Sequence, residues 1–237
     1  MHKPTSDRMQ QSQSLPLPLH FPRVKICGMK DPDSVMMAVK YGADAVGFIT
    51  EVPVSTPRKI DRETARELVA STPPLVSTVM VCMPDGLDNA LELARFVQPD
   101  AVQVHSSMSP EDLGTLKENT GVKIIKTIHI DGRTDVGNAV DEINGLYNIA
   151  DAILLDTKID GKTGGTGTVH DWARSAEITL HSSLPVILAG GLNPGNVADA
   201  IRTVRPYAVD TASGVETGSV KDEDKVMMFV NNARSVQ

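Results

Sequence analysis

Two polar side chains stand at the carboxyl ends of apolar runs, where they could act as a base and an acid. Cys27 follows residues 24–26, and Asp156 follows residues 153–155. A thiol has a reference pKa of about 8.5, so a modest shift makes it a base near neutral pH. Apolar walls around Asp156 predict a raised pKa, which suits a general acid. By residue type alone, such a cysteine is more often a buried hydrophobe, and such a carboxylate a cap or a salt-bridge partner.

A second chemical feature is a pair of apolar runs, residues 185–191 and 207–214, that each stop at glycine. Such loops expose backbone N–H groups, and barrels bind phosphate with the loops after their seventh and eighth strands. The sequence therefore predicts a phosphorylated small molecule as the ligand. The predicted phosphate-binding residues in these loops are Gly190, Gly191, Ser213 and Gly214.

Residues 160–167 form a glycine-rich segment after Asp156. It is not a Walker loop, because its lysine precedes the glycine cluster. We expect a hinged lid that closes over the phosphate, with Gly165 and Thr166 adding to the phosphate site. An inert, flexible turn is the alternative.

Alternating strands and helices are expected to position these residues. Short apolar runs alternate with amphipathic segments from residue 23 onward. The predicted strands are residues 24–27, 45–49, 75–82, 101–105, 122–128 and 152–156, and two more lie within the runs 185–191 and 207–214. Predicted helices open at Asp31-Pro32, Pro110 and Asn193-Pro194, and others cover residues 62–70, 87–96, 136–146 and 222–232. Eight such units in 237 residues predict one α/β domain, a (β/α)8 TIM barrel over residues 23–237.

The mouth of such a barrel gathers the residues that end its strands. Cys27, His105 and Asp156 each end a predicted strand, Asp210 lies late in the eighth, and Arg58 lies in the loop after the second. Cys82 occupies a similar place in the third strand, and we interpret it as a packing residue.

Composition limits the remaining possibilities. A net charge of -7 with 3% aromatic residues disfavours a nucleic-acid partner. No apolar stretch is long enough to span a bilayer, and two cysteines are too few for a disulfide framework, so a cytoplasmic location is expected. Residues 1–22 are rich in Ser and Gln and broken by proline, which predicts a disordered tail.

Eight segments, in order from residue 24 almost to the carboxyl end, resemble phosphoribosylanthranilate isomerase of tryptophan biosynthesis. They are KICG (25–28), GADAVGF (42–48), PR (57–58), VQVH (102–105), LDT (155–157), GGTG (164–167), LAGGLNP (188–194) and SGVE (213–216). The chain departs from the family pattern at Ser106-Ser107, where a glycine is expected, and over residues 50–56.

The resemblance implies an Amadori rearrangement of N-(5-phosphoribosyl)anthranilate to 1-(2-carboxyphenylamino)-1-deoxyribulose 5-phosphate. It assigns the general base to Cys27 and the general acid to Asp156, and it places Arg58 on the anthranilate. His105 and Asp210 are further expected substrate-binding residues, Asp210 holding a sugar hydroxyl or the anthranilate amine. No metal and no organic cofactor is implied, because the protonated imine of the substrate is itself the electron sink.

Two other functions stay open from the sequence. One is a metal-dependent pentose-phosphate epimerase, which needs paired histidines and aspartates at strand ends, where only His105 and His129 are available. The other is a sugar-phosphate-binding barrel without turnover. The sequence is compatible with either a monomer or a homodimer.

Overall fold

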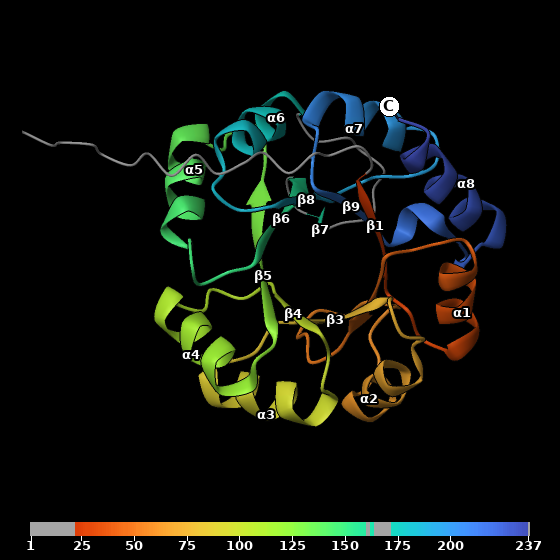
Figure 1. The fold of residues 1–237 in the computed structure, drawn as a ribbon, viewed down its shortest axis with the longest axis horizontal. Helices are drawn as coiled ribbons and strands as arrows, with labels where there is room; N and C mark the ends of the chain where they lie inside the picture. The colour runs from red at the N-terminus through yellow and green to blue at the C-terminus, as the bar shows by residue number, and fades with distance from the viewer. Residues whose placement is uncertain (1–21, 160–161, 164–171, 237) are drawn as a thin grey trace, which may run out of the picture.

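A closed barrel of parallel strands surrounded by helices forms the body of the protein (Figure 1). The structure is a computed structural model, and it describes residues 22–159, 162–163 and 172–236. In the described part of the chain, eight strands follow one another around the barrel in the order β5-β4-β3-β2-β1-β9-β8-β6, and pairing of β5 with β6 closes the ring. The predicted α/β fold, a (β/α)8 TIM barrel, is confirmed.

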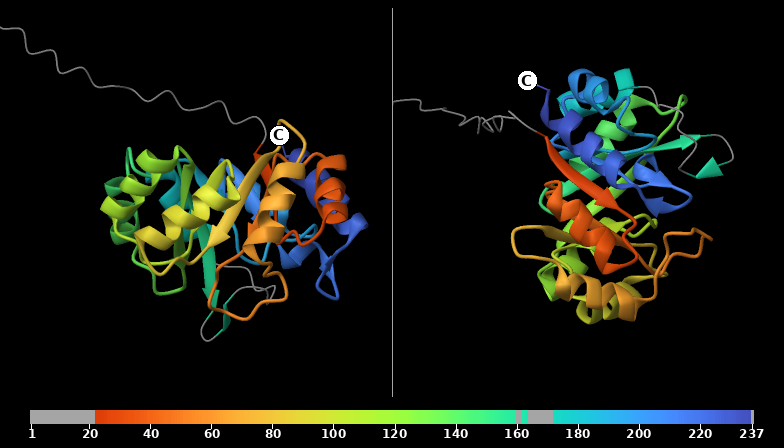
Figure 2. Two further views of the ribbon diagram at one scale, coloured as in Figure 1. Left: turned by 90° about the horizontal axis from the view of Figure 1, so that it is seen from below. Right: turned by 90° about the vertical axis from the view of Figure 1, so that its right-hand side faces the viewer.

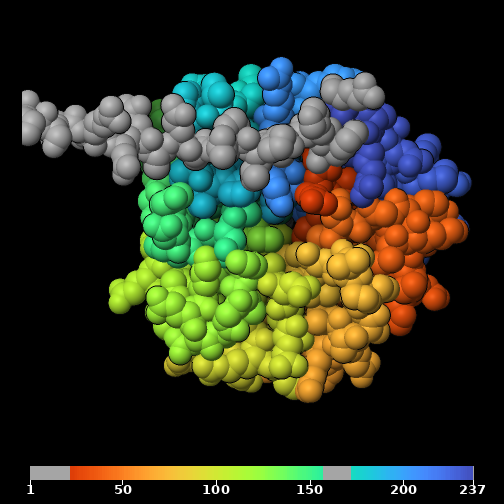
Figure 3. All heavy atoms as spheres, in the orientation of Figure 1, coloured from red at the N-terminus to blue at the C-terminus, as the bar shows by residue number. Residues whose placement is uncertain are grey.

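The elements alternate along the chain as the sequence predicts. The barrel strands are β1 (Arg23–Cys27), β2 (Ala45–Ile49), β3 (Ser77–Cys82), β4 (Ala101–Val104), β5 (Lys123–Ile130), β6 (Ala152–Ile159), β8 (Val186–Leu188) and β9 (Ala208–Thr211). The helices are α1 (Pro32–Lys40), α2 (Arg62–Ser71), α3 (Leu87–Val97), α4 (Pro110–Thr120), α5 (Val136–Gly145), α6 (Trp172–His181), α7 (Val197–Val204) and α8 (Glu223–Arg234). In the space-filling view these helices follow one another around the molecule, and α1 lies against α8 (Figure 3).

Short elements extend the loops at one end of the barrel (Figure 2). Strand β7 (Lys162–Thr163) pairs antiparallel with the end of β6. A 3₁₀ turn, η1 (Ser213–Val215), follows β9 and leads into a hairpin of β10 (Glu216–Thr217) and β11 (Val220–Lys221). The sequence analysis did not predict this hairpin.

Several predicted boundaries are wrong for local reasons. Leu75 is fully exposed with φ of 72°, a left-handed conformation that no strand accommodates, so β3 begins at Ser77. Asn193 opens a turn rather than a helix, because its Oδ1 accepts a hydrogen bond from the Gly195 N–H, and α7 starts at residue 197. His129, which follows the predicted strand 122–128, lies within β5.

The boundary of the predicted tail also moves. Pro22 is buried against the barrel, although the sequence placed it in the tail. Residues 1–21, the rest of the predicted disordered tail, lie outside the described residues. No helix in the described part of the chain is long and apolar enough to cross a membrane.

Alternation along the strands separates two hydrophobic layers. Large side chains such as Phe48, Met80 and Ile153 pack between the strands and the helices. The interior of the barrel holds smaller residues, many of them alanine or valine, around Cys27 and Leu154. Because successive side chains of a strand point to opposite faces, the inner layer continues upward into the residues that end each strand.

Three aspartates connect neighbouring strands by hydrogen bonds at the amino ends of the strands. Asp44, Asp100 and Asp151 each stand directly before a strand, namely β2, β4 and β6. Their carboxylates accept the backbone N–H of Val24, Thr78 and Ile124 in the preceding strand, at 2.8, 2.7 and 2.9 Å. Each of these bonds pairs a backbone N–H group that has no carbonyl partner in the neighbouring strand. The three aspartates therefore help to set the register of the strands.

We expect Asp100→Ala to destabilise the fold by about 1 to 3 kcal/mol, because it leaves the buried Thr78 N–H without an acceptor. Urea unfolding monitored by circular dichroism measures this change. Asp141→Ala, at an exposed position in α5, is the matched control and should change stability by less than about 0.5 kcal/mol. Equal effects of the two substitutions would contradict the role of Asp100 in connecting the two strands.

Candidate active site

A cavity of about 390 Å³ lies at the carboxyl ends of the strands. The loop after β2, strand β7 and the β10–β11 hairpin project at the same end of the barrel (Figure 2). Most of the residues predicted for the site line this cavity. They are Cys27, Arg58, His105, Asp156, Gly190, Gly191, Asp210 and Ser213. Gly214 follows directly in η1. Gly165 and Thr166 lie outside the described residues, as does the rest of the proposed lid except β7.

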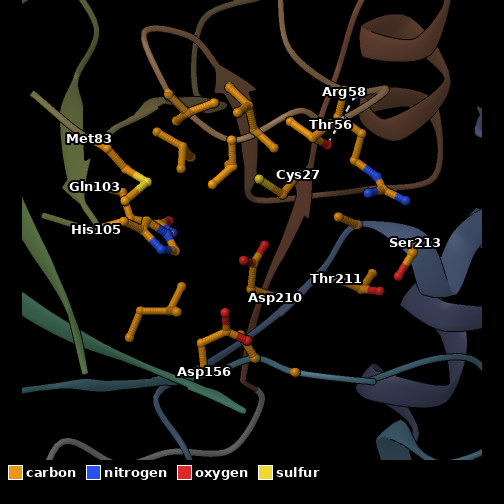
Figure 4. A pocket seen from close by; sticks show the side chains of 18 of the residues that line it. Cys27, Thr56, Arg58, Met83, Gln103, His105, Asp156, Asp210, Thr211 and Ser213 are labelled. Atoms are coloured by element: carbon orange, nitrogen blue, oxygen red, sulfur yellow. Dashed lines mark hydrogen bonds between the residues drawn. The ribbon is translucent and has the colours of Figure 1, made fainter. Parts of the chain in front are cut away.

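Cys27 ends β1 with its thiol turned into the cavity (Figure 4). Gly47 on the neighbouring strand makes room for it, because a Cβ there would lie 2.7 Å from the Cys27 Sγ. Cys82 instead packs in the layer between strands and helices, where burial raises its pKa to about 12. The interpretation of Cys82 as a packing residue therefore agrees with the structure.

A buried ion pair lies beside the Cys27 thiol. The Lys25 Nζ is 3.0 Å from Asp210 Oδ1, with side chains only 4% and 9% exposed. Burial works against the charge on Lys25, but the Asp210 carboxylate outweighs it, and the pKa of Lys25 is raised. Lys25 therefore remains an ammonium ion within interaction distance of the thiol.

The electrostatics around Cys27 favour the neutral thiol in the empty cavity. Burial is the largest influence, and it raises the thiol pKa. The Asp210 carboxylate acts in the same direction, while the ammonium groups of Lys25 and Lys221 oppose it. The net result is a raised pKa, opposite to the shift that a resting base needs.

Asp156 faces the same cavity from β6 (Figure 4). In that view it and Cys27 lie on either side of Asp210. Asp156 is paired in register with His129 on β5, so the carboxyl group stands beside a histidine of the neighbouring strand. The cavity thus brings together the predicted acid and the predicted base.

Two histidines and a glutamine line another side of the cavity. The His105 Nε2 lies 2.7 Å from Gln103 Nε2, and the His105 and His129 rings have centroids 6.0 Å apart. Burial, reinforced by the nearby His129, lowers the pKa of His105 to about 3, so its imidazole is neutral. Gln103 Oε1 is buried without a hydrogen-bond partner among the described residues. This side therefore offers neutral polar groups to a ligand.

The glycine loops after β8 and β9 lie against each other. Gly190 and Gly191 have φ of 86° and 69°, left-handed conformations that glycine adopts without strain. A Cβ on Gly214 would collide with the Leu192 carbonyl oxygen, so glycine there allows the two loops to touch. No described residue accepts a hydrogen bond from the backbone N–H of Gly191 or Ser213. These donors are available to an anion.

Arg58 makes a two-point ion pair with Glu216. Its Nε and Nη2 lie 2.9 and 2.6 Å from the two carboxylate oxygens. Lys221 also binds Glu216, at 2.7 Å. Sequence reasoning assigned no role to Glu216, Lys221 or Gln103. Alternation with His105 could have placed Gln103 inside the barrel, but no local signal links the other two to Arg58.

Together, the fold and the cavity define a (β/α)8-barrel protein whose mouth combines a thiol, carboxylates and two glycine-containing loops, the arrangement of barrel enzymes. A family model described as N-(5'phosphoribosyl)anthranilate (PRA) isomerase matches residues 24–232. The chain belongs to this family.

Similar proteins carry the same description. The N-(5'-phosphoribosyl)anthranilate isomerase 1 of Methanosarcina mazei is 48% identical over 221 residues, which cover 90% of this chain and 94% of that protein. The crystal structure of phosphoribosyl anthranilate isomerase from Thermotoga maritima has a TM-score of 0.78 at 35% identity, and the match covers 90% of this chain and 99% of that one. A structure of the isomerase in complex with reduced 1-(o-carboxyphenylamino)-1-deoxyribulose 5-phosphate has a TM-score of 0.75 at 34% identity, with 90% and 99% covered.

The Cys27 thiol of the ligand-free protein should titrate above its usual value of about 8.5, because burial disfavours the thiolate. The alkylation rate by iodoacetamide, followed peptide by peptide with mass spectrometry, should still rise with pH above that value. The Cys27→Ser variant gives the background rate of alkylation at Cys82. A midpoint at or below about 8.5 would show that the lysines outweigh burial.

Proposed function

We propose that this chain catalyses the Amadori rearrangement of N-(5-phosphoribosyl)anthranilate to 1-(2-carboxyphenylamino)-1-deoxyribulose 5-phosphate, with Asp156 as general acid and Cys27 as general base. The observation that carries the roles is the shared cavity, in which these two side chains lie beside loops suited to a phosphate. Membership of the isomerase family supports the reaction.

The reaction needs only proton transfers. Asp156 gives a proton to the furanose oxygen, the ring C–O bond breaks, and the anilino nitrogen becomes a protonated imine. Cys27 then removes the proton on the adjacent sugar carbon, and the electron pair moves toward the iminium nitrogen to form an enolamine. Tautomerisation gives the ketone, so substrate and product are isomers. Each positioned group is expected to contribute about 10²- to 10⁴-fold in rate.

The raised thiol pKa is compatible with a base that forms in the complex. An opposite charge a few ångströms away favours an ionised group, and the protonated imine is such a charge next to Cys27. Lys25 is a second cation beside the thiol, and its pairing with Asp210 holds it there. The thiolate is therefore favoured at the stage when a proton has to be removed.

The other residues of the site bind the substrate in this proposal. Arg58 binds the anthranilate carboxylate, since a guanidinium matches its planar geometry. His105 and Asp210 hold polar groups of the sugar or the amine. The phosphate lies on backbone N–H groups of the two glycine loops and is reached by the segment after β6. The proposed phosphate-binding residues are Gly165, Thr166, Gly190, Gly191, Ser213 and Gly214.

We propose a monomer or homodimer in the cytoplasm that acts on a small phosphorylated substrate without a metal or an organic cofactor. Among the described residues, no group of three or more His, Cys, Asp and Glu side chains is placed to hold a metal ion.

The direct test is a fluorescence assay with substrate prepared chemically from anthranilate and ribose 5-phosphate, so that its supply requires no metal-dependent enzyme. Added protein should abolish the emission of the substrate at an unchanged rate in excess chelator. Loss of activity with chelator, restored by a divalent metal, would favour the epimerase-like alternative. Binding without turnover would favour the non-catalytic barrel.

Cys27→Ser and Asp156→Asn should each lower kcat by at least about 100-fold while retaining the fold, because each removes one proton-transfer group. Steady-state kinetics and circular dichroism measure the two effects. Cys82→Ser is the matched control for the thiol, since Cys82 lies outside the cavity, and it should retain most of the activity. A variant with near-normal kcat would remove its residue from the proposed role.

A further inference from the structure

Glu216 and Lys221 form a buried ion pair on the hairpin beside the cavity. They face each other in register across β10 and β11, with 2.7 Å between Lys221 Nζ and Glu216 Oε1. Their side chains are 5% and 2% exposed. Burying charges this deeply costs free energy unless neighbouring groups form ion pairs or hydrogen bonds with them. Here the neighbouring groups that interact with this pair, Arg58 and the carbonyl oxygen of Cys27, belong to residues that line the cavity.

Glu216 determines which edge of the Arg58 guanidinium faces outward. It accepts hydrogen bonds from Nε and Nη2, which are the donors of one edge. The edge formed by Nη1 and the second Nη2 hydrogen remains, and within the described residues Nη1 donates no hydrogen bond. Two parallel N–H groups of that edge match a second carboxylate. Arg58 also packs over Gly28, where a Cβ would lie 2.8 Å from its Cδ.

Lys221 uses its three donors to connect this cluster with the catalytic strand. Besides Glu216, its ammonium group binds the carbonyl oxygens of Cys27 at 2.6 Å and Ala212 at 3.0 Å. It also sets the charge of the cluster. Arg58 and Glu216 alone would be neutral, and Lys221 leaves the group with a net charge of +1, which attracts an anion.

We propose that Glu216 and Lys221 are positioning residues for carboxylate recognition. Glu216 holds Arg58 with its outer edge toward the substrate, and Lys221 keeps the cluster positive and ties it to the carbonyl of Cys27. The inference rests on the proposed function, in which Arg58 binds the carboxylate of the aromatic ring.

Glu216→Gln separates orientation from simple attraction. The substitution raises the net charge of the cluster to +2, so attraction alone would tighten the binding of a carboxylate. If Glu216 orients Arg58, binding instead weakens, because a glutamine NH₂ cannot accept the second guanidinium hydrogen bond. We expect Kd for the reduced product to rise about tenfold or more, since charge-assisted bonds lose strength when misaligned.

Isothermal titration calorimetry should compare two ligands, the reduced product and its analogue without the ring carboxyl group. The rise in Kd should be confined to the first ligand, and turnover should show a raised KM with kcat within about twofold. Glu223→Gln is the matched control. It removes the same charge from an exposed pair with Lys40 and should leave both affinities unchanged. Unchanged or tighter binding of the reduced product by Glu216→Gln would overturn the inference.

The double variant Glu216→Gln/Lys221→Met repeats the test at the natural net charge of +1, because it removes the buried ammonium group of Lys221 together with the carboxylate that pairs with it. It should show the same carboxylate-specific loss, and equal losses with both ligands would also overturn the inference. Turnover by the unsubstituted protein tests the proposed function separately. Wild-type activity combined with a normal Kd in the variants would refute the positioning roles alone.

Discussion

The ion pair between Lys25 and Asp210 is the interaction on which the interior of this barrel depends. It joins the first and the last strand inside the seam where β1 pairs with β9. Neither charge can be buried without the other, since an unpaired charge in such a place costs several kcal/mol. The pairing of β1 with β9 that closes the barrel therefore also fixes the charged groups beside Cys27. A thiol two residues after Lys25 on the same face necessarily shares that environment.

Small residues inside the barrel and large ones outside it make the cavity possible. Gly47 leaves space for the thiol, and the small side chains of Ala189 and Ala212 line the cavity without filling it. The bulky residues between strands and helices carry most of the apolar burial. Stability and function are thereby assigned to opposite faces of the same strands, which allows polar groups to gather at the mouth without weakening the main core.

Charges at the mouth are distributed unevenly. His105 is neutral on one side, whereas Arg58 and Ser213 lie on the other (Figure 4). A ligand with two anionic groups fits this asymmetry better than a neutral one. In the proposed reaction, by contrast, the protonated imine is placed near the carboxylate of Asp210 and the thiol. The positive charge of the intermediate and the negative charges of the substrate therefore have different surroundings.

Strand and helix order was predictable because apolar periodicity is a local property. Residues 45–49 and the helix start at Arg62 match the structure, while Leu75 shows that an apolar residue can end outside its strand. The three aspartates before β2, β4 and β6 repeat an Asp-Ala pattern that is visible in the sequence. Its meaning follows only from the neighbouring strand whose N–H each carboxylate accepts.

The sequence by itself determined the number of βα units, the inward face of each strand and hence the candidates Cys27 and Asp156, since alternation and strand ends are short-range features. Tertiary structure alone decided that Glu216 binds Arg58, 158 residues away, and that burial raises the thiol pKa. Such contacts arise only when the barrel closes and brings the last loops against the first strands. The energy of a buried charge depends on every group around it, and no spacing along the chain encodes that sum.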